Sequence, residues 1–196
     1  PERSPLPIEA LRSIIRIFPV QSYTMSYSPW NHSSGCDVVS LNCPASGSTN
    51  HGRAISYVAE RLEIPATVYV PEWVDPVKLE GIRARGADAV VTGATFDESE
   101  AAAFIFATES GRTYVSAYDD PWVIAGQGTV ALEMLEDAPE IDTLVIPIGG
   151  GGLISGIATI ARDLNPDIEI VGVQSALYPS MFARIKGEEH VCGGDT

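Results

Sequence analysis

From Cys36 onward, the chain alternates between short apolar runs and longer segments in which apolar residues recur every three or four positions. The runs predict buried strands, and the helical spacing predicts helices. Because strands and helices alternate, we expect βαβ units: an α/β fold with open, mostly parallel sheets and helices on both faces. The predicted strands are 38–41, 66–70, 89–91, 114–115, 144–148 and 168–173, and the predicted helices are 50–63, 76–85, 96–110, 120–135 and 153–164.

The residues before Cys36 lack a sustained period, apart from an apolar stretch at 11–18. The segment 21–34 is rich in Ser and Tyr and is typical of a loop. This part of the chain predicts no function.

Composition and charge narrow the class of protein. Hydrophobic residues make up 45% of the 196 residues and charged residues 19%, as in an ordinary globular protein. The formal net charge of −14 repels phosphate backbones and anionic lipid, which argues against nucleic-acid or membrane-surface partners. No apolar run approaches the roughly 20 residues that span a bilayer. The net charge does not exclude a small anionic ligand, because a few backbone N–H groups can bind one.

The three cysteines, Cys36, Cys43 and Cys192, form no C-x-x-C pair. An odd number without ligand-like spacing favours reduced thiols over a disulfide framework or a zinc site. The start of the chain has no signal-peptide pattern. We therefore expect a cytoplasmic protein.

Four consecutive glycines follow the predicted strand 144–148 and precede a predicted helix. Glycines there let backbone N–H groups close around phosphate oxygens, and the helix dipole favours an anion. A tight turn for close helix–strand packing is the alternative. The spacing fits neither a P-loop nor the G-x-G-x-x-G fingerprint. The candidate anion-binding residues are Gly149, Gly150, Gly151 and Gly152.

A second polar cluster, SGSTNHG at 46–52, also lies between a predicted strand and a helix. Ser48, Thr49, Asn50 and His51 gather short polar side chains where orphan helix N–H groups could receive a carboxylate. One of the first three could equally serve only as the N-cap. His51 alone is more typical of a structural hydrogen bond than of a catalytic base.

The third cluster is AGQGT at 125–129, inside a predicted helix. Gly126 and Gly128 weaken that helix by about 1 kcal/mol each relative to Ala, so either another element or a ligand comes close there. Asp119 and Asp120 precede it as a paired-carboxylate candidate, but Asp120 is better explained as a cap for a helix that begins at Pro121.

Taken in order, these motifs resemble the fold-type-II pyridoxal-phosphate enzymes, specifically the threonine ammonia-lyase (threonine dehydratase) and serine racemase branch. The resemblance covers about 38–196 and implies a tryptophan synthase β-like fold. The matching stretches are SGSTNHGRAISYVAERLEIPATVYVPE, KLEGIRARGADAVV, DDPWVIAGQGTVALEML, IPIGGGGLISGIA and VGVQSALYPSMFARIKGE.

The resemblance implies pyridoxal 5'-phosphate as the cofactor. Gly149–Gly152 and Leu153 would hold its phosphate, and Asn50 would lie beside its ring hydroxyl. The substrate would be a small amino acid, threonine or serine, converted to 2-oxobutanoate or pyruvate and ammonia.

The resemblance also implies a substrate-binding set. Ser48 falls where racemases of this group place a second proton-transfer serine, so it is the one catalytic candidate, and racemase activity is left open. The implied substrate-binding residues are Ser48, Thr49, His51, Gly126 and Gln127.

Three departures from the family pattern stand out. Thr49 stands where the family has a glycine directly before the Asn, and Gly47 stands where the family has a serine. Gln174 stands where serine racemase has an acidic metal ligand, so no metal is predicted. The Schiff-base lysine is not found: the only lysines, Lys78 and Lys186, lie outside its motif and are expected at the surface.

We therefore expect a partial chain of a homo-oligomeric enzyme. The predicted small domain is 36–118, and 1–35 with 119–196 would form part of the large cofactor-binding domain. The alternative to the ammonia-lyase is a non-catalytic protein that binds pyridoxal phosphate or another small phosphorylated ligand.

Overall fold

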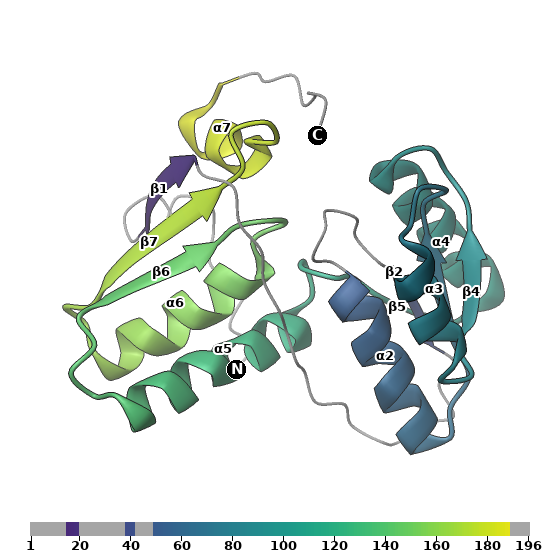
Figure 1. The fold of residues 1–196 in the computed structure, drawn as a ribbon, viewed down its shortest axis with the longest axis horizontal. Helices are drawn as coiled ribbons and strands as arrows, with labels where there is room; N and C mark the ends of the chain where they lie inside the picture. Colours follow the sequence, from purple (N-terminus) through teal and green to yellow (C-terminus); the bar gives the residue numbers. More distant parts are fainter. Residues whose placement is uncertain (1–14, 20–37, 42–48, 189–196) are drawn as a thin grey trace. The chain divides into compact units, whose positions relative to one another are not determined.

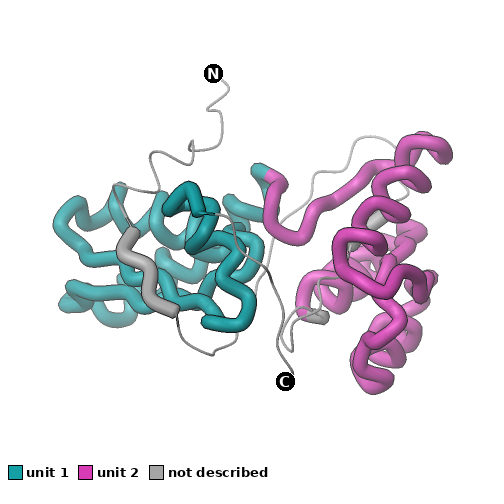
Figure 2. The backbone as a smooth tube through the Cα atoms, turned by 90° about the horizontal axis from the view of Figure 1, so that it is seen from above, with its two compact units in different colours: residues 1–23, 121–196 teal, residues 24–120 magenta. Residues whose placement is uncertain are grey.

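The computed structural model describes residues 15–19, 38–41 and 49–188, with the backbone alone of 15–19, 38–41 and 49. The chain divides into two compact units, residues 24–120 and residues 1–23 with 121–196 (Figure 2). In chain order the elements are β1 (Ile15–Pro19), β2 (Val38–Leu41), α2 (Thr49–Leu62), β3 (Ala66–Val70), α3 (Pro76–Arg83), β4 (Asp88–Val91), α4 (Phe96–Ser110), β5 (Thr113–Val115), α5 (Pro121–Asp137), β6 (Thr143–Pro147), α6 (Gly152–Leu164), β7 (Glu169–Gln174) and α7 (Ser180–Lys186).

The unit of residues 24–120 is built on a parallel sheet with strand order β4-β3-β2-β5. Helices α2 and α3 pack on one face and α4 on the other (Figure 1). The chain runs outward from β2 to β4, and α4 then returns it to β5, on the other side of β2. The order of the strands therefore reverses between β2 and β5, and such a switch point is where open α/β sheets bind ligands.

The core of this unit is made of aliphatic side chains from the central strand and the helices. Val68, Val70, Ile82 and Val115 are fully buried. The strand β3 is buried along its whole length, as a central strand covered on both faces should be. The aromatic ring of Tyr69 adds a contact with α4.

The other unit holds a parallel sheet with strand order β1-β7-β6. Helices α5 and α6 lie together along one face (Figure 1). Strands β6 and β7 alternate buried and more accessible residues: Leu144, Ile146 and Ile170 face the core, whereas Val145 in β6 is 64% exposed.

The structure confirms the predicted α/β alternation and adds two elements. β1 falls in the apolar stretch noted before Cys36, but its pairing with β7, in which Ile15 lies opposite Ile170, could not be foreseen from local pattern. The helix α7 is only seven residues long, below the window in which periodicity is informative.

Candidate functional site

The glycine loop, Gly149–Gly152, joins β6 to α6. Just before it, the Ile148 N–H donates to the Val173 carbonyl at 2.6 Å, which fixes the end of the strand. Gly151 is the N-cap of α6 with φ of +95°, a left-handed conformation that favours glycine, and it provides no side-chain cap. The Ser155 N–H donates to its carbonyl at 3.0 Å. Helix α6 thus begins with backbone N–H groups that no N-cap side chain occupies.

The space around the loop suits an anion. A Cβ at Gly149 would meet no heavy atom within 4 Å, and one at Gly151 would meet the Met181 methyl carbon at 3.0 Å. Gly149 and Gly150 are exposed, and the first turn of α6, which the structure describes in full, contains no acidic residue. Exposed N–H groups at the positive end of a helix dipole can bind a phosphate oxygen.

Close contact with α5 fixes the position of α6. A Cβ at Gly156 would lie 2.3 Å from the Ile124 carbonyl oxygen and 2.7 Å from the Gly128 nitrogen, so the two helices touch through their backbones. A Cβ at Gly128 would meet the Ile160 Cγ1 at 2.7 Å. The glycine at 128 in the AGQGT motif therefore serves helix packing. Gln127, in the same motif, is fully buried.

In the other unit, the first turn of α2 lies at the strand switch point. Its Asn50 is half-buried and its His51 is buried. Burial lowers the pKa of His51 from 6.5 to about 4, against smaller opposing effects of a backbone hydrogen bond with Val115 and of the Asp120 charge. The ring is therefore neutral at pH 7.

The two ring nitrogens of His51 differ. Nε2 has no hydrogen-bond partner within the described residues. The bond with the Val115 backbone therefore falls on Nδ1, and because this bond raises the pKa we assign Nδ1 as the donor. Nε2 is then an acceptor at the carboxyl end of β5.

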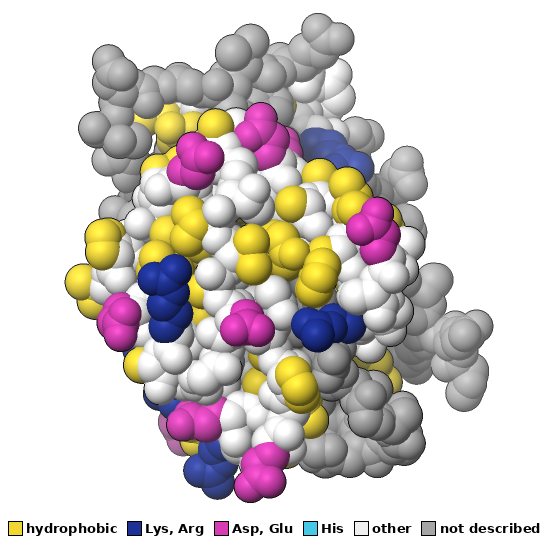
Figure 3. All heavy atoms as spheres, turned by 90° about the vertical axis from the view of Figure 1, so that its right-hand side faces the viewer, with side chains coloured by type: hydrophobic (Ala, Val, Ile, Leu, Met, Phe, Trp, Pro, Cys, Tyr) yellow, Lys and Arg dark blue, Asp and Glu magenta, His cyan; other side chains and the backbone are white. Residues whose placement is uncertain are grey.

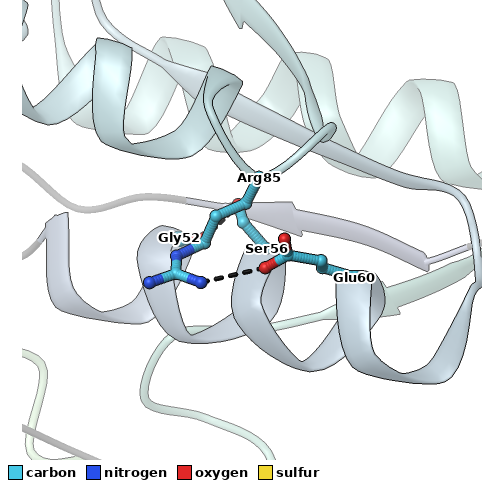
Figure 4. Close-up of polar contacts among 4 residues, drawn as sticks. All are labelled: Gly52, Ser56, Glu60 and Arg85. Carbon is cyan, nitrogen blue, oxygen red and sulfur yellow. Dashed lines mark hydrogen bonds and ion pairs between the residues drawn. The ribbon is translucent and has the colours of Figure 1, made fainter.

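Polar contacts hold α2 in place (Figure 4). The buried Ser56 hydroxyl donates to the Gly52 carbonyl at 2.7 Å, one turn earlier in the helix. The Arg85 Nη1 contacts the Glu60 Oε2 at 2.9 Å, and its guanidinium also lies 4.8 Å from the centre of the Tyr57 ring. The ion pair is partly exposed, so each contact contributes modestly.

Two acceptors order β5 and the segment that follows it. The Ser116 hydroxyl oxygen accepts the Asp119 N–H at 3.1 Å. The Glu100 carboxylate accepts the hydroxyls of Tyr114 at 3.1 Å and Tyr118 at 3.4 Å. Burial and the Glu100 charge raise the pKa of Tyr114, so its hydroxyl stays a donor.

The predicted site residues divide between the two units. Asn50 and His51 belong to residues 24–120, whereas Gly126, Gln127, Gly149–Gly152 and Leu153 belong to the other unit. Ser48 lies outside the described residues, and of Thr49 only the backbone is described. The ligand-binding roles of all these residues stay predictions.

Three further residues near the glycine loop were not among the site residues predicted from the sequence. Gly156 carries the α5 contact, Met181 contacts Gly151, and the buried Gln174 accepts the Phe182 N–H of α7 at 2.9 Å. Only Gly156 had a signal, as a glycine inside an apolar helix. Gln174 entered the sequence comparison only because it stands where serine racemase has an acidic metal ligand.

The two lysines lie in different surroundings. Lys186, in the last turn of α7, is exposed, with its Nζ 5.7 Å from the centre of the Phe182 ring. Lys78 is half-buried in the first turn of α3, where the Asp75 carboxylate accepts its backbone N–H at 3.3 Å.

Within the described ranges, no helix is both long enough and apolar enough to cross a membrane.

Comparison with known families gives a match to residues 39–194, and the family is that of the pyridoxal-phosphate dependent enzymes. An L-threonine ammonia-lyase of Geobacter sulfurreducens is 45% identical over 131 residues, which are 67% of this chain and 33% of that protein. The chain spans about a third of the length of the curated relatives it matches.

Solved structures of related enzymes are similar to this chain as well. The processed form of threonine deaminase isoform 2 from Solanum lycopersicum matches with a TM-score of 0.68 and 33% identity, covering 78% of this chain and 41% of that one. Maize serine racemase matches with a TM-score of 0.70 and 32% identity, covering 81% and 47%.

Proposed function

The chain belongs to the family of pyridoxal-phosphate dependent enzymes, and from this premise we propose that it is threonine or serine ammonia-lyase-like, with pyridoxal phosphate bound at the glycine loop. The substrate would be threonine or serine and the products 2-oxobutanoate or pyruvate with ammonia. Support comes from the L-threonine ammonia-lyase that is 45% identical to this chain over 131 residues.

One observation carries the proposal: α6 begins at a left-handed glycine with no capping side chain, beside exposed Gly149 and Gly150. A phosphate monoester needs several N–H donors and room for its oxygens, and a Cβ at Gly149 would meet no atom within 4 Å. The residues present therefore fit the phosphate of the cofactor. The overall negative charge is no obstacle, since no acid lies in the first turn of α6, which the structure describes completely.

When bound, pyridoxal phosphate supplies electron withdrawal from the amino-acid Cα, which favours loss of the Cα proton and of the β-hydroxyl. In our proposal, the N–H groups of Gly149–Gly152 bind and orient the phosphate, and the Asn50 amide orients the ring hydroxyl. Ser48 and Thr49 bind the substrate carboxylate together with His51.

His51 can take part only as a neutral ring. With a pKa of about 4 it carries no charge at pH 7, so it would orient a substrate by hydrogen bonding at Nε2. Gly126 and Gln127 would complete the substrate-binding set. For Gln127, burial against α6 supports an indirect contribution through the position of that helix.

We also propose the organisation around the site. The small domain would be 36–118, with 1–35 and 119–196 in the cofactor-binding domain. Association of copies is supported by exposed apolar side chains, including Phe104 and Ile105 of α4 at 57% and 54% exposure, and apolar groups gather on one face in Figure 3. The odd number of cysteines, without a C-x-x-C pair, supports a reducing compartment such as the cytoplasm.

A second candidate, ligand binding without turnover, is favoured by the lysines. Covalent attachment of the cofactor needs a lysine that loses its proton inside the site, and Lys186 is exposed whereas Lys78 lies in the first turn of α3. For this chain by itself we accordingly expect 2-oxobutanoate formation from threonine no faster than with free pyridoxal phosphate.

The test separates binding from turnover. Calorimetry with pyridoxal phosphate, pyridoxal and inorganic phosphate should give binding of the first and third and weak binding of pyridoxal, because the loop binds the phosphate. Equal affinity for pyridoxal and its phosphate would contradict the proposed site.

Turnover is then measured as 2-oxobutanoate from threonine and pyruvate from serine, against the same concentration of free cofactor. A rate well above the free cofactor that is lost in Lys78→Ala, and kept in Lys186→Ala, would assign the attachment to Lys78 and exclude the binding-only candidate.

A further inference from the structure

The glycine loop has a neighbour in α7. The Met181 methyl carbon lies 3.0 Å from the position that a Cβ of Gly151 would occupy. Met181 also packs against the core of its unit, beside the side chains of β6 and α6. It therefore occupies the space next to the N-cap of α6 and limits how far the loop can shift toward α7.

A buried side chain of β7 bonds the residue that follows Met181. Gln174, at the end of β7, is only 3% exposed, and its Oε1 accepts the Phe182 N–H at 2.9 Å. Phe182 follows Met181 directly in α7. Pro179, the N-cap of α7, makes no side-chain cap, so the Gln174 carbonyl takes the place that a capping side chain usually fills.

The connection between β7 and α7 contains one other side-chain cap. The Ser175 hydroxyl oxygen accepts the Leu177 N–H at 3.3 Å. This bond orders the loop before α7 but touches neither α7 nor Met181. It therefore provides a matched control for the effect of Gln174.

We propose that Gln174 is a positioning residue for the glycine loop: by binding the Phe182 N–H it seats Met181 against Gly151 and holds the loop in the form that accepts a phosphate group. The proposal rests on the proposed function for the identity of the ligand. The positioning itself concerns only residues of the unit that contains α6 and α7.

The first variant is Gln174→Met, which keeps the length of the side chain and removes the acceptor. Inorganic phosphate and pyridoxal phosphate should both bind about fivefold more weakly, as expected for the loss of one buried hydrogen bond. Gln174→Glu keeps an oxygen that can accept the Phe182 N–H and should restore most of the affinity. Ser175→Ala should bind both ligands as the unchanged chain does.

A readout without ligand tests the positioning alone. The Ser155 N–H, bonded to the Gly151 carbonyl, reports on the first turn of α6, and its hydrogen exchange should be faster in Gln174→Met and unchanged in Ser175→Ala. A merely structural Gln174 would lower the urea midpoint while leaving the affinity of the folded chain and this exchange rate as they were. That result would overturn the proposal.

A double-mutant cycle tests the route through Met181. If Gln174 acts by seating Met181, then Met181→Ala should abolish the further effect of Gln174→Met on phosphate affinity and on Ser155 exchange. Strictly additive effects would exclude this route and contradict the proposal.

The two proposals fail differently. If the unchanged chain binds neither phosphate nor pyridoxal phosphate while Gln174→Met still accelerates Ser155 exchange, the proposed function fails and the positioning stands. If binding is present but neither readout responds to Gln174→Met, the positioning fails and the proposed function stands.

Discussion

Helices α4 and α6 begin in opposite ways. At α4, the Thr95 hydroxyl oxygen accepts the Glu98 N–H at 3.2 Å, and the Glu98 carboxylate accepts the N–H groups of Ala94 and Thr95. At α6, the N-cap is Gly151 and no side chain caps the helix. The first N–H groups of α4 are thus satisfied by side chains of the chain itself, whereas those of α6 have no capping side chain, which is the condition that the proposed phosphate site requires.

The first turn of α2 presents a third arrangement. It brings side chains rather than bare N–H groups to the carboxyl end of its sheet, and one of them, His51, is a buried neutral ring. If the proposed site is correct, ligand recognition would use fixed backbone donors in one unit and an uncharged hydrogen-bonding side chain in the other.

The largest effect is expected where the backbones of α5 and α6 touch. Gly156→Ala would place a methyl group 2.3 Å from the Ile124 carbonyl oxygen, so the helices must separate, and we expect to lose more than about 3 kcal/mol of unfolding free energy in urea. In Gly128→Ala the added methyl group would meet the Ile160 side chain at 2.7 Å, which can rotate, and the Gly156 carbonyl oxygen only at 3.2 Å, so this variant should cost less. Equal losses in the two variants would contradict a backbone contact as the cause.

The pH dependence of His51 comes next. Its pKa is lowered to about 4 in the folded chain, so between pH 6.5 and 4 the unfolded chain binds more protons and stability falls as the pH falls. The stabilisation is complete above pH 6.5, and about 3 kcal/mol is lost on reaching pH 4. Urea unfolding of the unchanged chain and of His51→Gln over this pH range isolates the contribution of His51 to the free energy of unfolding. If the two chains lose stability in parallel as the pH falls, the prediction is wrong.

Gly151→Val introduces a branched side chain at the N-cap of α6. The side chain would fill the space beside Met181 and oppose the left-handed φ of +95°, so phosphate affinity should fall about a hundredfold, equivalent to about 2.7 kcal/mol. The control is Gly111→Val, at φ of +69° with open space around its Cβ position. It should cost similar strain and leave phosphate binding intact.

Removing the cap of α4 gives the smallest effect. Thr95→Ala should cost about 1 kcal/mol in thermal or urea unfolding, because the Glu98 N–H loses its acceptor. It should not create phosphate binding, since Asp97 and Glu98 remain in the first turn. Calorimetric binding of phosphate that appears in this variant would show that an open N-terminus alone is sufficient, contrary to the comparison.

The sequence was informative where local chemistry decides the structure. The four glycines predicted a helix that begins directly after them, and α6 begins there without a side-chain cap. As predicted, α5 begins at Pro121, after the paired aspartates. The alternation of apolar runs and helical segments predicted a mostly parallel α/β arrangement, whereas the division into two domains came from the family resemblance. Periodicity and turn chemistry act over a few residues, which is the range that such reasoning covers.

What could not be predicted depends on contacts between distant segments. The sequence left two explanations for Gly126 and Gly128, a close element or a ligand, and only the position of α6 against α5 explains Gly128. Gln174 caps a helix eight residues later, beyond the reach of any local capping pattern. No local sequence pattern marks Met181, because its position beside Gly151 depends on where α7 lies after β7.

The contact between α5 and α6 has a mechanical consequence. Side chains usually separate packed helices, and their changes of rotamer let one helix slide along the other. At Gly156 and Gly128 the peptide groups themselves meet, so no such compliance exists there. We therefore expect the two helices to move together, so that a displacement of the glycine loop also displaces α5.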